Sequence, residues 1–422
     1  MLSNNKVPYF VCTMLLVSTN LSANEINNQS QINFDQAIKQ TLTHNLELEG
    51  YRYKLNSHQY QIKHSGLSPS PEVELKVEDA YGSGRFSEFD NAQVSLNISW
   101  VVEGDLREAI VEYEKTGILK IDNDLIIKKL NISAQTARYY ITSLAFQAQL
   151  ENAIAAMRHA KDVISEVKKR LRAGRTTQAE LVRAQAQLAH RELEVDDIKH
   201  EMESAYYQLA SQWGKQKPDF KRALGTVYSI PKIKTLEKII LDLNKSPALK
   251  KLSLHRQEKL AQLDIEKEKS SSNWKVNLGV RSSQATDDQS IIAGISIPFG
   301  ERSRNKYKIA QVKQELLEVE SNTNAQIQKL RTNLFVLYEE FKHHQHQIDA
   351  HQNKIIPLLE KALVQAKRAY HLGRYSYLDW SSVQQELIKA KQKLLVASAE
   401  AQLKIIDIQR ISGISIKLNK NF

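Results

Sequence analysis

The sequence has a single cysteine, few glycines and prolines, and only one long apolar run. Of its 422 residues, 14 are glycine and 8 are proline, whereas Glu, Gln, Lys, Ala and Leu are abundant. The lone Cys12 excludes a disulfide framework and a cysteine metal site. A composition with so few turn-forming residues favours long helices, including coiled coils.

The apolar run spans residues 7–18 (VPYFVCTMLLVS), with Lys6 before it and small residues ending at Ala23 after it. This pattern is typical of a secretory signal peptide. We therefore expect residues 1–23 to be removed on export. The alternative is a retained membrane anchor, for which the run is short. No later stretch is apolar enough to predict a transmembrane helix.

The sequence also lacks features of nucleic-acid binding and of catalysis. The net charge is +11, but Lys and Arg alternate with Glu rather than forming a basic block. This spacing indicates solvated helix faces rather than a nucleic-acid site. The common catalytic motifs G-x-x-x-x-G-K-[ST], H-E-x-x-H and G-x-S-x-G are absent. We expect no enzyme, no catalytic residue and no cofactor.

What the chain does contain is a repeat with an offset of 199 residues. RAGRTTQAEL, with Gly174, is echoed by HLGRYSYLDW, with Gly373, and a motif ending at Gly214 is echoed by one ending at Gly413. This offset indicates a duplicated unit rather than a solenoid. We expect a first repeat (24–214), a connector (215–234), a second repeat (235–413) and a C-terminal tail (414–422).

Each repeat contains two segments in which apolar and polar residues alternate strictly. The predicted strands cover residues 72–80, 92–102, 274–281 and 291–297. Such alternation fits a half-buried strand, and it also fits a transmembrane barrel strand with an apolar outer face. The candidate lipid-facing residues are Val94, Leu96, Ile98, Trp100, Ile295 and Ile297.

Each strand pair is followed by helical stretches with a period of 3.5 residues, the spacing of coiled coils. Two of them, roughly 105–175 and 301–372, would each be about 100 Å long. In the second, the predicted seam includes Leu334, Phe341, Ile348, Ile355 and Leu358. The predicted fold is therefore mostly α with transmembrane β-strands.

Four strands are too few to close a barrel, and hydrocarbon excludes open sheet edges. Two copies would supply eight strands, which leave an interior filled by side chains, whereas three copies would supply twelve and a water-filled lumen. A homotrimer is therefore the arrangement that forms a pore. The alternative is a soluble protein whose two hairpins pack on a helical rod.

The repeated glycine phrase is typical of the tip of a helical hairpin. Gly174 and Gly373 suit a left-handed helix end. Thr177 with Glu180, and Ser376 with Asp379, have the spacing of capping boxes that begin the return helices.

This order of elements, with its GR-x-[TS]-x-x-[DE] tips and its closing WG and SG motifs, resembles the TolC family of outer-membrane efflux channels. The resemblance covers nearly the whole mature chain, and its look is nearest to the heavy-metal or cation efflux (CzcC-like) branch. It implies a passive trimeric conduit in the Gram-negative outer membrane, with a helical part in the periplasm. The implied partners are a periplasmic adaptor (membrane fusion) protein and an inner-membrane pump of the RND type.

The resemblance also implies roles for the tip residues. Asp379 and Glu180 are candidates for the aperture, although a capping acid is the alternative role for Asp379. The candidate adaptor contacts are Gly174, Arg175, Thr177, Gly373, Arg374 and Ser376. Where the family often has a second acid, this sequence has Ser382, which argues against a double carboxylate ring.

Two further questions concern metal and cargo. The stretch FKHHQHQIDAHQ contains His343, His344, His346 and His351, but a tight site needs three or four converging ligands. We interpret these histidines as packed or tunnel-facing and expect no metal site. The cargo remains open between metal cations, drugs and secreted polypeptides. A periplasmic coiled-coil interaction protein without a channel is the alternative of another class.

Overall fold

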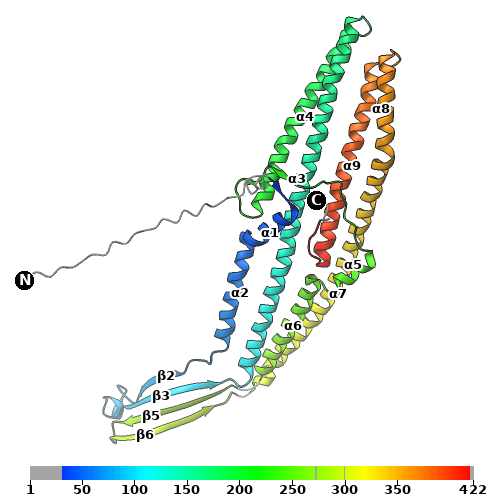
Figure 1. Ribbon diagram of the computed structural model, residues 1–422. Coiled ribbons are helices and arrows are strands. Elements are labelled where there is room, and N and C mark those ends of the chain that lie inside the picture. The colour runs from blue at the N-terminus through cyan, green and yellow to red at the C-terminus, as the bar shows by residue number, and fades with distance from the viewer. Residues whose placement is uncertain (1–30, 271–272, 299, 419–422) are drawn as a thin grey trace, which may run out of the picture.

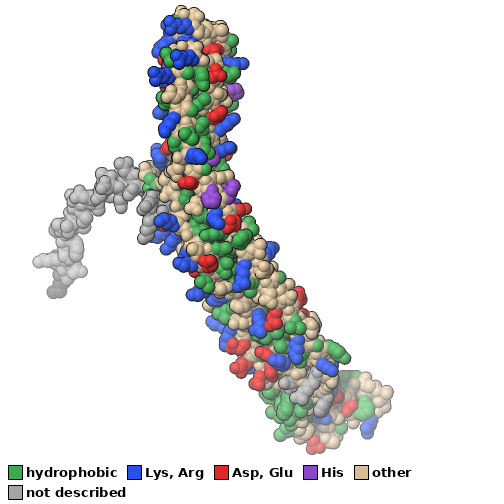
Figure 2. Space-filling view, turned by 90° about the vertical axis from the view of Figure 1, so that its right-hand side faces the viewer, with side chains coloured by type: hydrophobic (Ala, Val, Ile, Leu, Met, Phe, Trp, Pro, Cys, Tyr) green, Lys and Arg blue, Asp and Glu red, His purple; other side chains and the backbone are tan. Residues whose placement is uncertain are grey.

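The protein is a long, bent rod of helices with a sheet at one end (Figures 1 and 2). The computed structural model describes residues 31–270, 273–298 and 300–418. The predicted signal segment, residues 1–23, lies outside the described residues.

The elements follow one another in an order that repeats. They are β1 (Gln31–Ile32), α1 (Phe34–His44), α2 (Leu46–Ser65), β2 (Glu72–Glu78), η2 (Gly84–Phe86), β3 (Gln93–Val102), α3 (Leu106–Arg172), α4 (Gln178–Ser211), β4 (Arg222–Ala223), α5 (Leu236–Leu243), α6 (Pro247–Glu268), β5 (Trp274–Ser283), β6 (Asp288–Ser296), α7 (Glu301–Ala350), η3 (His351–Ile355), α8 (Ile356–His371) and α9 (Tyr377–Ser412).

Each very long helix packs against two shorter ones. Helix α3, with 67 residues, is about 100 Å long and lies beside α2 near the sheet and beside α4 towards the tip (Figure 1). The continuous path α7–η3–α8 packs in the same way on α6 and then on α9. The two hairpin tips therefore lie together at the end of the rod farthest from the sheet (Figure 1).

The strand boundaries differ from the sequence expectation by a few residues. Strand β2 ends at Glu78 rather than at residue 80, because Asp79 adopts a positive φ of 59°. Strand β5 continues to Ser283, where it pairs with Asp288, so β6 begins three residues earlier than expected. Strand β6 ends at Ser296, which leaves Ile297 outside it.

The predicted seam of the second long helix is correct only as far as its middle. Leu334, Phe341 and Ile348 are buried, as expected. Ile355 and Leu358, however, are 36% and 57% exposed. The expectation fails at this point because the helix changes its phase.

The change of phase is a π-turn, η3. The amide of Ile356 donates to the carbonyl oxygen of His351, five residues earlier, so the helix accommodates one additional residue. Pro357, which lacks an N–H, follows directly. The seam then resumes one residue later, at Ile356, Leu359, Leu363, Ala366 and Tyr370.

The middle of the rod contains the main hydrophobic core, to which the connector is attached. Strand β1 pairs in parallel with β4, and the Tyr140 hydroxyl donates to the carbonyl oxygen of Leu224 at 2.6 Å. Gln147 exchanges two hydrogen bonds with the backbone of Ala223, and Tyr206 donates to Gln147 at 2.7 Å. Burial raises the pKa of Tyr140, and it raises that of Tyr206 to about 12. These contacts fix the connector against α3.

Candidate functional site: the sheet and the hairpin tips

The four-stranded sheet has one apolar face. Its order is β2-β3-β5-β6, antiparallel throughout, and the register places apolar residues of adjacent strands side by side. The face consists of Val73, Leu75, Val77, Val94, Leu96, Ile98, Trp100, Val102, Trp274, Val276, Leu278, Val280, Ile291, Ala293 and Ile295. Much of it is open in the single chain, with Ile291 83% and Ile295 65% exposed. An exposed apolar face of this extent marks a contact surface.

The candidate lipid-facing residues lie on this face, with one exception. Val94, Leu96, Ile98, Trp100 and Ile295 belong to it, whereas Ile297 follows the end of β6. Their contact with lipid remains a prediction. Figure 2 shows hydrophobic side chains gathered at the end of the rod that carries the sheet.

The opposite face of the sheet is polar and closely fitted. A Cβ atom on Gly279 would lie 2.1 Å from Oδ1 of Asn97, so glycine makes room for this amide. Ser95 Oγ, Asn97 Oδ1 and Arg281 Nε are buried without a hydrogen-bond partner among the described residues. Buried polar atoms normally have a partner in protein or water, so this face is suited to hydration.

Both edges of the sheet are open. Within the part of the chain that the structure describes, β2 pairs only with β3, and β6 pairs only with β5. Each edge therefore presents unpaired backbone N–H and C=O groups along a full strand.

The tip of the second hairpin has the geometry predicted from its sequence. Gly373 adopts a positive φ of 76°. Asp379 Oδ2 accepts hydrogen bonds from the Ser376 amide at 3.0 Å and from its hydroxyl at 2.8 Å, and the Asp379 amide donates to Ser376 Oγ. These bonds from Ser376 hold the pKa of Asp379 below its usual value of 3.8. The carboxylate is therefore ionised and also caps α9.

The tip of the first hairpin differs from the prediction. Gly174 has the expected positive φ of 67°. The Glu180 amide donates to Thr177 Oγ1 at 3.4 Å, but the carboxylate of Glu180 does not complete a capping box. It accepts instead from the hydroxyl of Thr176, the residue before the cap. The Thr176 hydroxyl thus takes the place of the Thr177 backbone amide, which would donate to Glu180 in a complete capping box.

A contact between the two tips was not predicted from the sequence. Arg170, near the end of α3, stacks over the ring of Tyr370 with its guanidinium carbon 4.2 Å from the ring centroid. It also donates to the carbonyl oxygen of Tyr370 at the end of α8. The Tyr370 ring is only 1% exposed and lies 5.1 Å from the ring of Trp380. Arg170 of the first hairpin thus anchors the last turn of α8 in the second hairpin.

The tip arginines proposed as adaptor contacts remain free. Arg175 and Arg374 are exposed, and neither side chain has an ion pair or hydrogen bond to another described residue. Below the tips, a groove of about 460 Å³ between α3, α8 and α9 is lined by apolar side chains that include Val163, Leu363 and Trp380. The tip region therefore offers two exposed cations beside a groove that is lined by both apolar and charged side chains.

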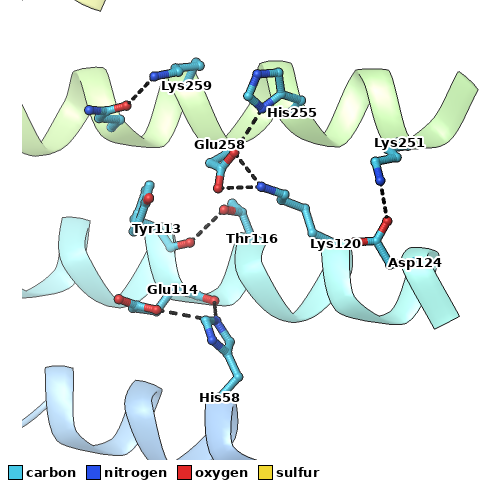
Figure 3. Close-up of polar contacts among 11 residues, drawn as sticks. His58, Tyr113, Glu114, Thr116, Lys120, Asp124, Lys251, His255, Glu258 and Lys259 are labelled. Carbon is cyan, nitrogen blue, oxygen red and sulfur yellow. Dashed lines mark hydrogen bonds and ion pairs between the residues drawn. The ribbon is translucent and has the colours of Figure 1, made fainter. Parts of the chain in front are cut away.

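Polar contacts join the helices nearer to the sheet (Figure 3). Both carboxylate oxygens of Glu258 on α6 accept from Lys120 Nζ on α3 at 2.7 Å, and His255 lies 3.1 Å from the same carboxylate. Partial burial acts to raise the pKa of Glu258, but the bonds and charges of Lys120 and His255 outweigh it and lower the pKa below 4.5. Lys251 pairs with Asp124 at 2.9 Å on the same two helices.

Helix α2 is attached to α3 through a histidine and through the ion pair of Glu47 with Lys128. His58 Nε2 donates to the carbonyl oxygen of Glu114 at 2.8 Å and lies 3.4 Å from its carboxylate (Figure 3). A Cβ atom on Gly117 would lie 2.3 Å from this nitrogen. The glycine in the middle of α3 therefore provides the space that the imidazole occupies.

The histidines of the FKHHQHQIDAHQ stretch do not converge. His343 Nε2 and His344 Nδ1 contact the side chain of Gln347, and His351 Nδ1 contacts the Gln347 carbonyl at 2.8 Å. His346 is exposed. Among the described residues, no group of three or more His, Cys, Asp and Glu side chains is placed to hold a metal ion.

Among the described residues, every helix lacks an apolar stretch long enough to cross a membrane.

Comparison with known proteins agrees with this geometry. The profile of the family described as outer membrane efflux protein matches residues 37–215. This match covers less than half of the chain. It is 22% identical over 382 residues to the cobalt-zinc-cadmium resistance protein CzcC of Cupriavidus metallidurans, with 90% of each chain covered.

Solved structures of outer-membrane and channel-forming proteins share the fold. CusC matches with a TM-score of 0.76 and 17% identity, over 90% of this chain and 92% of that one. The outer membrane protein VceC from Vibrio cholerae matches with a TM-score of 0.72 and 17% identity, over 91% and 97%. These matches show that the chain has the fold of CusC and VceC.

Proposed function

We propose that this chain is an outer membrane efflux protein, three copies of which join into a passive conduit across the outer membrane and the periplasm. The sheet with two unlike faces and two unpaired edges is the observation that carries this proposal. Hydrocarbon does not tolerate unpaired strand edges. Pairing β6 of one copy with β2 of the next removes both edges, and three copies supply enough strands for a water-filled lumen.

In this arrangement each part of the chain has a place. The apolar face, with Trp100 and Ile295, contacts acyl chains, and the polar face lines the lumen. The long helices of two tandem repeats, residues 24–214 and 235–413, continue the lumen as a hollow stalk. The tips form the far mouth, where Arg175 and Arg374 contact a periplasmic adaptor protein and Asp379 and Glu180 face the aperture.

For the cargo, we propose metal cations delivered by an inner-membrane pump of the RND type. The name of the relative CzcC, a cobalt-zinc-cadmium resistance protein, supports this choice. The alternatives are drug efflux and type I polypeptide secretion. The sequence of the duct separates these alternatives poorly, because the pump rather than the duct selects the cargo.

Two experiments test the proposal. Membrane fractionation and electrophoresis of unboiled and boiled samples should show a heat-sensitive trimer in the outer membrane, whereas a dissolved monomer or dimer would refute the conduit. Deletion of the gene should lower tolerance of zinc, cobalt or copper and be reversed by complementation. Unchanged tolerance of all metals with lost tolerance of drugs would refute the metal cargo alone.

A further inference from the structure

Charged side chains on the polar face of the sheet are balanced at both of its ends. At the end near the helices, Lys275 Nζ lies 2.6 Å from Glu72 Oε2. At the end near the hairpin loops, Lys76 Nζ lies 2.6 Å from Glu78 Oε1. Each of these ion pairs is electrically neutral.

Two further charges at the loop end also offset each other. The strand register places Arg281 in the row of Lys76 and Ser95, and it places Asp288 in the neighbouring row, which contains Glu78. The strand residues at the loop end of the polar face therefore comprise two acids and two bases, and Asp79, just after β2, adds a carboxylate that accepts from the Gln93 side chain at 3.0 Å.

Glu74 is the charged strand residue of this face that has no balancing charge beside it. It lies between the two ends of the sheet, in the row of Asn97 and Gly279. Its side chain is exposed and makes no ion pair or hydrogen bond with the residues that the structure describes. The side-chain oxygen of Asn97, in the same row, is buried over Gly279 on the side of β3 away from Glu74.

Closure of the sheet does not supply a counterion to Glu74. Strand β2 is an edge strand, and in the proposed conduit its neighbour is β6 of the next copy. The residues of β6 on the polar face are Asp288, Ser290, Ile292, Gly294 and Ser296, none of which is basic. The negative charge of Glu74 thus stays uncompensated in the trimer.

We infer that Glu74 determines the preference of the barrel lumen for cations, an inference that rests on the proposed trimeric conduit. Threefold symmetry brings three Glu74 carboxylates to one level of the lumen. Hard cations favour carboxylate oxygens, and anions are repelled by the charge. The ion pairs on either side are neutral and have no net effect on selectivity.

The test is the reversal potential of the purified trimer in planar bilayers under a KCl gradient around 0.1 M. Glu74→Gln should lower the ratio of cation to anion permeability, because one unit charge about 4 Å away changes the local concentration of each monovalent ion about fivefold in water, in opposite directions. Glu74→Lys should lower it further. At about 1 M salt, where screening acts within about 3 Å, the difference should largely vanish.

The matched control is the double variant Glu72→Gln with Lys275→Gln, which removes two charges of the same face without changing its net charge. It should keep the native permeability ratio. Native permeability in both Glu74 variants, or an equal shift in the control, would overturn the inference while leaving the conduit intact. The absence of any channel current from the native protein would instead overturn the conduit itself.

Discussion

Asp379 combines two roles that single substitutions separate. Its carboxylate caps α9 through Ser376, and in the proposed trimer three copies surround the far mouth. We expect Asp379→Ala to widen the resting mouth and to raise conductance in planar bilayers. Asp379→Asn, which keeps an acceptor for the Ser376 amide but loses the charge, should raise it as well. Native currents in both variants would leave only the capping role.

Arg170 joins the two tips, so its removal should loosen the second hairpin. In Arg170→Ala, the last turn of α8 loses a charged hydrogen bond and a stacking contact of about 0.5–2 kcal/mol. We expect higher conductance and faster amide exchange at residues 366–373. The control, Arg172→Ala, changes an exposed arginine of the same turn and should have neither effect. Equal exchange in the two variants would contradict the role of Arg170.

At the residue scale, the sequence predicts local geometry better than long-range contacts. The φ angles of Gly174 and Gly373 and the capping box of Ser376 depend on neighbours within four residues, and all three agree with the prediction. The contact of Arg170 with Tyr370 depends on two hairpins meeting in space. The repeat gives no hint of it, because the 199-residue offset aligns Arg170 with Ala369.

At the scale of elements, α2 is held weakly and its attachment can be tested. The helix buries no residue, and His58 occupies the space left by Gly117. Gly117→Ala should favour helix α3 locally by about 1 kcal/mol, yet its Cβ atom would displace the imidazole. We expect faster amide exchange throughout α2, measured by mass spectrometry.

The control for this prediction is Gly50→Ala on α2. A Cβ atom there has no neighbour within 4 Å, so the substitution should stabilise α2 by about 0.5–1 kcal/mol. If Gly117→Ala leaves the protection of α2 unchanged, His58 does not hold this helix.

The π-turn η3 leads to a prediction about chain length. It adds one residue between the buried Ile348 and Ile356, and the next residue is Pro357. Deletion of the exposed Asn353, combined with Pro357→Ala, should give a continuous α-helix with both buried residues in register. We expect the midpoint of thermal unfolding of the trimer to change little. Deletion of Gln328 should lower it strongly, because it rotates Leu334 out of the core by about 100°. Equal losses in the two variants would contradict this account.

The elements themselves follow from short patterns, which explains where the predictions hold and where they fail. Alternation in residues 93–102 and heptads up to Ile348 are properties of contiguous sequence, so these elements could be predicted. The π-turn interrupts the heptad pattern with a single additional residue. Its cause is local strain at Pro357 and continued packing of Ile356, which a fixed period cannot represent.

At the scale of the whole molecule, the sequence predicts a sheet with too few strands to close, and the structure shows which two strands form its open edges. A chain with two strand pairs has open edges under any order of pairing, so several copies are needed in hydrocarbon. The order β2-β3-β5-β6 could not be derived from alternation alone. It determines that β2 and β6 are the joining strands, and therefore that Glu74 lies at the joint.

The most direct test of the account asks whether the apolar face contacts lipid. Trp100 is 36% exposed on that face, whereas Trp213 is 4% exposed in the core of the rod. Two variants, each retaining one of these tryptophans with the others changed to Phe, would be reconstituted in bilayers with brominated acyl chains. The account predicts strong quenching of Trp100 fluorescence and little quenching of Trp213. Trp100 fluorescence as insensitive to bromine as that of Trp213 would contradict the account.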